Sequence, residues 1–515
     1  MNHGKNTANP DGFASILTKG QQKSTYKKRV RIIRAALSER NFKMTNNYIE
    51  YIDDSSMKSL CEELEKNNRI ATGDFSKYGV KKGLRNSDGT GVMAGLTQIC
   101  SVEGYYINDG ERVPKEGRLI YRGYDMATLV KNCQTENRFG FEEIAWLLIF
   151  GSLPTKEQLE MFRATLAMCR ELPDDFIEDM IMKAPSPDIM NKMARSVLAL
   201  YSYDSNPDDT SVENMLRQCI HLVAQLPSIM TYAYQVKRRT YYKKSMYIHQ
   251  PKPEHSTAET ILRFTRADRT FTDEEAKLLD LLLCIHAEHG GGNNSTFTTR
   301  VLSSSGTDTY SAIGAAIGSL KGPRHGGANI KAHQMIAEIY ENVKNHESDG
   351  EIADYLKKII NKEAGDRSGL IYGMGHAIYT LSDPRAVLLK EKAGEFAKGT
   401  EYEERFNMIS RIEALSPQVF AEVKGVKKPL CANVDMYSGL IYEMLKIPVD
   451  LFTPMFAVAR VAGWSAHRIE EMTTAKKIIR PAYKSVAHAR EYVSLDERTE
   501  SEGTSSGIYI PREQR

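Results

Sequence analysis

The sequence predicts a mainly α-helical protein with one small β-ribbon near its N-terminal end. From about residue 125 onward, apolar side chains recur at intervals of three and four residues, and alternating apolar and polar runs are almost absent. Between residues 90 and 125 the pattern is different, because two alternating runs, 97–107 and 117–124, flank the turn-rich segment NDGERVPKEG. This arrangement is typical of two paired strands.

The helices are expected in a definite order along the chain. The first begins at about residue 56, where Met57, Leu60, Cys61 and Leu64 follow a serine cap at helical spacing. Amphipathic helices are then predicted within 139–153, 155–172 and 211–236. Segment 273–289 is apolar on most faces, which predicts a buried central helix. Segments 335–365 and 386–425 are more charged and are predicted as surface helices of a smaller unit.

Changes in composition predict the domain boundaries. Residues 44–328 and 439–484 are expected to form a large domain, residues 329–438 a small domain, and residues 485–515 a polar tail. Residues 1–43 hold ten Lys and Arg but only two acids, so they are excluded from the fold. They fit a targeting presequence, a disordered tail or a reading frame begun upstream of its real start.

The overall composition excludes several classes of partner. The 515 residues carry 69 Lys and Arg against 66 Asp and Glu, and a net charge of +3 gives no reason to expect nucleic acid or a membrane surface. No apolar run approaches the roughly 18 residues that would indicate a membrane-spanning helix. The cysteines are odd in number and lack a C-x-x-C pair, which favours a reduced, intracellular protein without a disulfide framework. They are Cys61, Cys100, Cys133, Cys169, Cys219, Cys284 and Cys431.

Four short segments rich in glycine or proline carry the polar residues that indicate chemistry. They are HAEHGGGN (286–293), GPRHGGAN (322–329), GMGHAIYTLSDPR (373–385) and ANVDMYSG (432–439). Such backbones do not form ordinary helix interiors, so their side chains are candidates for a site. Their histidines, arginines and aspartate are the groups needed to make a carbanion and to join it to a polycarboxylate.

The first segment has two interpretations. His286 and His289 are three residues apart and would share a helix face, with the following glycines ending the helix just after His289. This end would expose the His289 ring to a cavity. The pair also resembles part of a metal site, although no third ligand lies close in the sequence.

The second and third segments place a histidine among glycines. A helix predicted to start near Ala328 would aim its free N–H groups toward His325, which favours an oxyanion or enolate, although a simple turn also fits. Arg324 would suit a phosphorylated cofactor. His376 follows Gly-Met-Gly, and Arg385 is suited to bidentate capture of a carboxylate. The G-x-G lacks a third glycine and a preceding strand, so it does not predict a dinucleotide site.

The fourth segment offers a carboxylate. Asp435 is expected in a non-helical stretch before the helix YSGLIYEML, where it either caps that helix or serves as a base kept ionised by the helix onset. Arg460 is predicted on an otherwise apolar helix. A buried arginine needs an anionic partner, which is either a structural acid or a substrate carboxylate.

Seven segments in order resemble the citrate synthase family over roughly residues 50–483. They are LIYRGYD, HAEHGGGN, GPRHGGAN, GMGH with DPR, NVDMYSG, IPVDLFTP and FAVARVAGWSAH. The resemblance implies a mainly helical homodimer with a large and a small domain and a shared active site. It implies the condensation of acetyl-CoA with oxaloacetate and water to give citrate, with acetyl-CoA as co-substrate, no tightly bound cofactor and no metal.

The resemblance also implies a role for each site residue. His325 would hold the enolate of acetyl-CoA, Asp435 would remove the methyl proton, and His376 would protonate the carbonyl oxygen of oxaloacetate. The oxaloacetate carboxylates and carbonyl would be bound by His289, Arg385 and Arg460, and by Arg480 from the partner subunit. The acyl-CoA contacts would come from Arg324, Leu370, Gly373 and Met374.

Two of the segments depart from the family pattern, HAEHGGGN at two positions and GPRHGGAN at one. Glu288 replaces the usual aspartate and Gly290 the usual glutamate, while Arg324 stands where an apolar residue is common.

Several alternative functions remain. A 2-methylcitrate synthase, which takes propionyl-CoA, would use the same residues, since one methyl group changes the discrimination between acyl donors by only about 1–3 kcal/mol. An inactive regulatory relative and a metal-dependent lyase are further alternatives. The expected location is the cytoplasm, or an organelle matrix if residues 1–43 are a presequence.

Overall fold

The computed structural model describes residues 54–67, 70–86, 88–425, 429–487 and 489–498, so the predictions for 1–43 lie outside the described residues. The chain divides into two units, and the larger one comprises Lys81–Tyr483. The smaller unit, in its described part, contains α2 (Asp54–Asn67), α3 (Thr72–Lys77) and the short 3₁₀ helix η7 (Leu495–Glu497). The predicted first helix is confirmed as α2. Its apolar residues Met57, Leu60 and Leu64 are 43–59% exposed within the described chain.

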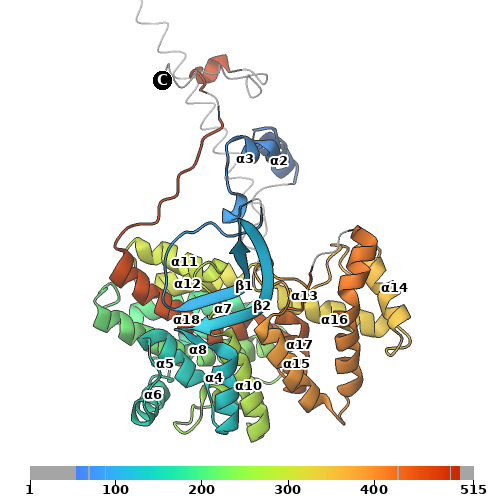
Figure 1. Ribbon diagram of the computed structural model, residues 1–515. Helices are drawn as coiled ribbons and strands as arrows, with labels where there is room; N and C mark the ends of the chain where they lie inside the picture. The colour runs from blue at the N-terminus through green and yellow to red at the C-terminus, as the bar shows by residue number, and fades with distance from the viewer. Residues whose placement is uncertain (1–53, 68–69, 87, 426–428, 488, 499–515) are drawn as a thin grey trace, which may run out of the picture. The chain divides into compact units, whose positions relative to one another are not determined.

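The predicted β-ribbon is present near the start of the larger unit. Strands β1 (Cys100–Asn108) and β2 (Glu111–Tyr121) pair antiparallel, from Cys100 opposite Tyr121 to Asn108 opposite Glu111. A short third strand, β3 (Tyr124–Asp125), pairs with the end of β2. Figure 1 shows β1 and β2 as a long twisted hairpin.

The regular elements of the remaining described chain are helices, which confirms the mainly α-helical class. The α-helices of the larger unit are α4 (Met126–Thr135), α5 (Phe141–Phe150), α6 (Lys156–Met168), α7 (Ile189–Leu200), α8 (Val212–Thr240), α9 (Thr257–Thr265), α10 (Asp273–His286), α11 (Asn294–Ser304), α12 (Thr309–Lys321), α13 (Ala328–Asn342), α14 (Asp349–Ile360), α15 (Pro384–Ala397), α16 (Glu403–Lys424), α17 (Asp435–Met444) and α18 (Phe452–Glu470). Shorter helical turns are η2 (Lys82–Leu84), η3 (Ile177–Met182), η4 (Tyr201–Tyr203), η5 (Val449–Leu451) and η6 (Glu471–Ala475). None of the helices in the described ranges is long and apolar enough to cross a membrane.

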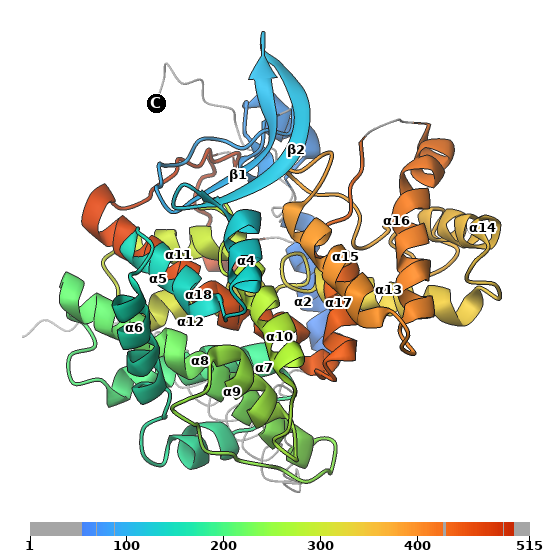
Figure 2. The same ribbon diagram turned by 60° about the horizontal axis from the view of Figure 1, so that its bottom comes forward.

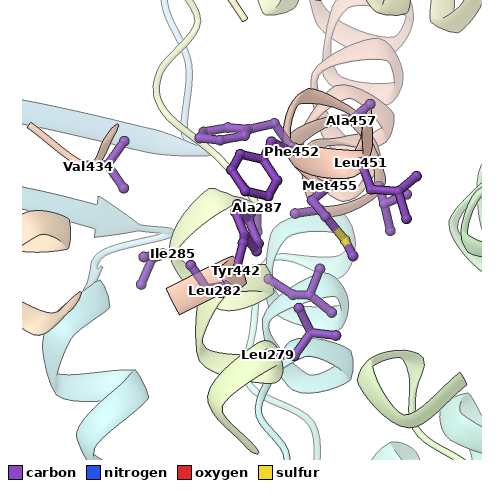
Figure 3. Packing of buried hydrophobic residues seen from close by; sticks show 14 of the residues in the cluster. Leu279, Leu282, Ile285, Ala287, Val434, Tyr442, Leu451, Phe452, Met455 and Ala457 are labelled. Atoms are coloured by element: carbon purple, nitrogen blue, oxygen red, sulfur yellow. The ribbon is translucent and has the colours of Figure 1, made fainter. Parts of the chain in front are cut away.

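Helix α18 forms the centre of the core. Every residue from Phe452 to Arg468 is buried, and α18 packs against α5, α8, α10, α11 and α12. Helix α10 is also buried along most of its length, as its apolar sequence predicts. Figure 3 shows Leu282 and Ile285 of α10 in one cluster with Phe452 and Met455 of α18. Polar groups carried by α18 are therefore surrounded by protein.

Helices α13 to α17 gather on one side of this core. Figures 1 and 2 both show them there, and α14 packs on α16 while α17 packs on α13 and α15. The charged segments 335–365 and 386–425 contribute α14, α15 and α16, as the sequence predicts. The boundaries of the small domain at 329 and 438 stay predictions.

The β1–β2 ribbon forms hydrogen bonds with the loop that follows His376. The hydroxyl of Thr380 donates to the carbonyl of Gly104 at 2.9 Å, and the N–H of Gly117 donates to the Ser382 hydroxyl at 3.1 Å. A Cβ atom on Gly117 would lie 2.1 Å from the carbonyl oxygen of Ser382, and one on Gly104 would lie 2.5 Å from that of Ile378. Both glycines are therefore required by the close approach of two backbones.

Replacing Gly117 by Ala is expected to displace this loop. The added methyl group should cost about 1–3 kcal/mol in the free energy of unfolding, measured by denaturant titration. Gly350→Ala at the start of α14 is the matched control, because its Cβ would meet nothing closer than 3.8 Å. Equal stability of the two variants would contradict the close approach.

Candidate active site

One cavity collects most of the predicted site residues. It measures about 150 Å³ and is lined by His289, Asn293, Leu320, His325, Gly326, His376, Arg385, Asn433, Val434, Asp435, Phe456 and Arg460. These residues come from the four segments, from α18 and, for Leu320, from α12. The prediction that the glycine-rich and proline-rich segments converge is therefore consistent with the structure.

Hydrogen bonds join the loop before His376 to the loop before Asp435, and both residues line the cavity. The N–H of Gly375 donates to the carbonyl of Cys431 at 2.7 Å, and the N–H of Asn433 donates to the carbonyl of Gly373 at 2.8 Å. Gly373 and Gly375 have φ angles of +85° and +86°, which side-chain-bearing residues rarely adopt. The Asn433 amide then donates to the carbonyl of Gly375 at 2.9 Å and completes the junction.

The contacts of His325 define which nitrogen carries its hydrogen. The backbone N–H of Ser295, at the start of α11, donates to Nε2 of His325 at 3.3 Å, and the Ser295 hydroxyl oxygen lies 3.0 Å from the same nitrogen. Because a backbone N–H can only donate, its contact assigns the hydrogen of His325 to Nδ1. Burial, assisted by the charge of Arg460, lowers the pKa of His325 to about 4. Helix α13 begins at Ala328, as predicted, so its N-terminus lies close in sequence to this ring.

His376 has the opposite tautomer. The backbone N–H groups of Ile378 and Tyr379 both donate to its Nδ1 at 3.1 Å, which leaves the hydrogen on Nε2. Burial and the neighbouring charge of Arg385 lower the pKa of His376 to about 4. The ring is neutral at physiological pH and offers a hydrogen-bond donor.

Asp435 differs from two expectations. It is the first residue of α17 and not part of a non-helical stretch, and no side-chain cap is found at the start of that helix. Burial raises the pKa of Asp435 to about 6, against the opposing influence of Arg385 and of a hydrogen bond from Asn329. The helix onset therefore does not hold its pKa down, because desolvation is the larger effect. The carboxylate is still ionised at neutral pH.

The cationic side chains facing the cavity are deeply buried. Arg385 is 4% exposed and donates Nε and Nη2 to Asp383 at 3.0 and 2.7 Å. Arg460 is 2% exposed, its Nε donates to the carbonyl of His286 at 2.6 Å, and it makes no ion pair with any described residue. His289 is buried with no described hydrogen-bond partner for its Nε2. These groups are suited to an anionic ligand with several oxygens.

The prediction that His286 and His289 share a helix face is wrong. Helix α10 ends at His286, three residues earlier than expected, so His286 and His289 do not share a helix face. His286 instead stacks on Phe456 with ring centroids 3.8 Å apart, outside the set of cavity residues. Within the described ranges, no group of three His, Cys, Asp or Glu residues is arranged to hold a metal ion.

The remaining predicted residues lie outside the cavity. Arg324 and Leu370 are exposed, and Gly373 and Met374 belong to the two joined loops. Arg480 is exposed in the segment after α18, next to Ile479, whose N–H donates to Ser304 at 3.0 Å. Their predicted contacts with acyl-CoA and with a partner subunit stay predictions.

The sequence did not predict a role for three residues of the site. Asp383, which holds Arg385, has a usable signal, because an Asp before Pro predicts a helix start, and Asp383 does cap α15. Ser295, which fixes His325, and Asn433, which joins the two loops, have none, since their contacts lie 30 and 58 residues away.

The pH dependence of activity should follow Asp435. A carboxylate that accepts a proton must be ionised, so kcat/KM is expected to fall as the pH drops through about 6, the pKa of Asp435 in the ligand-free protein. His325 and His376, with pKa values of about 4, are neutral across this range and should add no second step near neutrality. A profile of kcat/KM against pH tests this, and a profile flat down to pH of about 5 would contradict it.

A helical enzyme that sets an ionisable carboxylate and two neutral histidines around buried arginines is built for acid–base chemistry on an anion. Comparison with known proteins shows the family to which the chain belongs. Residues 86–482 match the family model for the citrate synthase C-terminal domain. A citrate synthase of Corynebacterium glutamicum is 31% identical over 424 residues, which cover 79% of this chain and 91% of that protein. The 2-methylcitrate synthase 1 of the same organism is 33% identical, over 82% of this chain and 99% of that protein.

A solved structure of a citrate synthase has the same fold as this chain. The citrate synthase of Thermoplasma acidophilum, in a ternary complex with carboxymethyl coenzyme A and oxaloacetate, superposes with a TM-score of 0.65 and 27% identity. The match covers 81% of this chain and 99% of that one. The chain therefore belongs to the citrate synthase family and is a transferase.

Proposed function

We propose that the protein condenses acetyl-CoA with oxaloacetate and water to give citrate and free CoA. The observation that carries this proposal is the single cavity that holds Asp435, two neutral histidines of opposite tautomer, and two buried arginines. The arginines and His289 suit the two carboxylates and the carbonyl of oxaloacetate. The histidines and Asp435 suit proton transfers on either side of a new carbon–carbon bond.

Each proton transfer in this condensation can be assigned to a residue of the cavity. The methyl group of a thioester is a very weak acid, so Asp435 removes its proton only if the enolate is stabilised as it forms. The hydrogen on Nδ1 of His325 is free to bind the thioester oxygen, because Nε2 is occupied by Ser295. The enolate carbon then attacks the carbonyl carbon of oxaloacetate, whose oxygen takes the hydrogen from Nε2 of His376. Water finally hydrolyses the thioester and releases CoA.

The alternative acyl donor is propionyl-CoA, which would make the protein a 2-methylcitrate synthase. Relatives with either name are similar at 31–33% identity, so identity does not separate them. The test is release of free CoA thiol with oxaloacetate, comparing kcat/KM for acetyl-CoA and propionyl-CoA. A higher value for propionyl-CoA would move the assignment without changing the mechanism, and no release with either would favour an inactive relative.

We also propose a homodimer in which Arg480 completes the partner's site. Arg480 is exposed and lies outside the cavity of its own chain, as a residue acting in the other subunit would. Asp435→Ala and Arg480→Ala dimers should each be nearly inactive, whereas unfolding and refolding them together should restore about one quarter of the activity through mixed dimers with one intact site in half the molecules. No recovery on mixing would contradict a shared site.

The location of the protein is a separate proposal. The scattered, unpaired cysteines support a reducing compartment, and we place the protein in the cytoplasm. An organelle matrix is the alternative if residues 1–43 act as a presequence. Mass spectrometry of the N-terminus of the natural protein distinguishes them, because a presequence would be removed.

A further inference from the structure

A buried carboxylate outside the cavity joins two segments that carry substrate-facing groups. Glu288 is fully buried and follows the end of α10, one residue before His289. Its Oε1 accepts the N–H of Gly290 at 2.6 Å and lies 3.1 Å from Nε2 of His467 on α18. The same helix carries Arg460. Glu288 therefore connects the turn that holds His289 to the helix that holds Arg460.

The partners of His467 orient it toward Glu288. Nε of Arg300 donates to Nδ1 of His467 at 3.0 Å, so the hydrogen of His467 is on Nε2, where it is donated to Glu288. Arg300 in turn donates to Glu471 at 2.7 Å and to Glu470. The result is a buried chain of hydrogen bonds that leads from α11 through α18 to the His289 turn.

The residues around Glu288 favour the charged form of its carboxylate. Burial raises the pKa of Glu288, but His467 and the charge of Arg460 outweigh this effect and hold its pKa below the usual value. A Cβ atom on Gly463 of α18 would lie 2.0 Å from Oε2 of Glu288. Only glycine at that position leaves room for the carboxylate.

Both flanks of His289 are thereby tied to α18. On the N-terminal side, Nε of Arg460 donates to the carbonyl of His286 at 2.6 Å. On the C-terminal side, Glu288 links the N–H of Gly290 to His467. The three glycines after His289 would otherwise leave that turn free to move.

We propose that Glu288, acting through His467, is a positioning residue that fixes His289 relative to Arg460 and so sets the affinity for the dicarboxylate. This inference rests on the proposed function, because it takes oxaloacetate as the ligand of His289 and Arg460. Glu288 does not line the cavity, and its influence on the substrate is exerted through the backbone of the His289 turn.

Kinetics of three variants test the proposal. Glu288→Ala and His467→Phe, which remove the link, should raise KM for oxaloacetate by about tenfold or more while KM for the acyl-CoA changes by less than about twofold. Glu288→Gln keeps an oxygen that accepts from both Gly290 and His467, so it should stay within about threefold of the wild-type KM. Parallel increases in both KM values, or a Gln variant as weak as the Ala variant, would overturn the proposal.

Asp280→Ala is the matched control. Asp280 is also a buried carboxylate that accepts backbone N–H groups, those of Gly140 at 2.6 Å and Phe141 at 3.2 Å, but it lies outside the cavity. Its loss should lower the melting temperature and leave both KM values unchanged. If Glu288→Ala does not fold, the contrast between His467→Phe and Glu288→Gln still decides.

Direct calorimetric titration with oxaloacetate separates this inference from the proposed function. A wild-type protein that binds oxaloacetate but releases no thiol fails as a synthase, and the weaker binding expected for Glu288→Ala and His467→Phe is still measurable. A wild-type Kd matched by both variants would overturn the positioning role whatever the catalytic result.

Discussion

Replacing Asp435 by Asn is expected to lower kcat by about 10²–10⁴-fold, the usual loss for a positioned base. The amide fills the same space but accepts no proton at neutral pH. Oxaloacetate binding, measured by calorimetry, should be nearly unchanged, since the arginines and His289 are intact. Thermal stability should not fall, because the raised pKa of Asp435 means that its ionised form gains nothing from folding at neutral pH.

Asp349→Asn is the matched control for this experiment. Asp349 is likewise the first residue of a helix, α14, but it is exposed and pairs with Arg411 at 2.6 Å, away from the cavity. Its replacement should leave kcat unchanged. If Asp435→Asn retained wild-type turnover, the base would have to be another residue.

Replacing Arg460 by Met is expected to raise KM for oxaloacetate by about 10²-fold or more, as the loss of a buried charged partner typically costs about 2–5 kcal/mol. The folded protein should keep a thermal stability close to that of the wild type, because the cost of burying the charge offsets the loss of the hydrogen bond to the carbonyl of His286 and of the attraction to Glu288. Burial lowers the pKa of Arg460, which shows that its charge is poorly solvated, and it makes no ion pair with a described residue. Steady-state kinetics and thermal unfolding measure the two effects.

Arg468→Met distinguishes a substrate-binding arginine from a structural one. Arg468 is on the same helix and fully buried, but it donates to the hydroxyls of Thr309 at 2.9 Å and Ser303 at 3.2 Å. Its loss should lower stability and leave KM unchanged. The opposite pattern, with Arg460→Met unstable and kinetically normal, would make Arg460 the structural residue.

Much of the fold was predictable because the signals are local. The alternating runs before residue 125 predicted the β1–β2 ribbon, and the apolar segment from Asp273 predicted the buried helix α10. The start of α13 at Ala328 followed from the glycines before it. Each of these features depends on residues that are neighbours in the chain.

Other features were missed or wrong because they depend on tertiary contacts. Helix α10 ends at His286, and the glycines after His289 do not show this in the sequence. Asp435 begins helix α17, although the sequence predicted it in a non-helical stretch before that helix. The need for glycine at position 117 arises from a loop 265 residues away.

The candidate site divides in the same way. The sequence by itself predicted His325, His376, Arg385 and Asp435 as residues of the site, because each stands in or beside a segment rich in glycine or proline. Only the tertiary structure decided their chemical states. The hydrogen on His325 and on His376 is placed by backbone amides, and the pKa of Asp435 is raised by burial. Desolvation and hydrogen-bond geometry depend on everything that packs around a group, and most of that lies elsewhere in the chain.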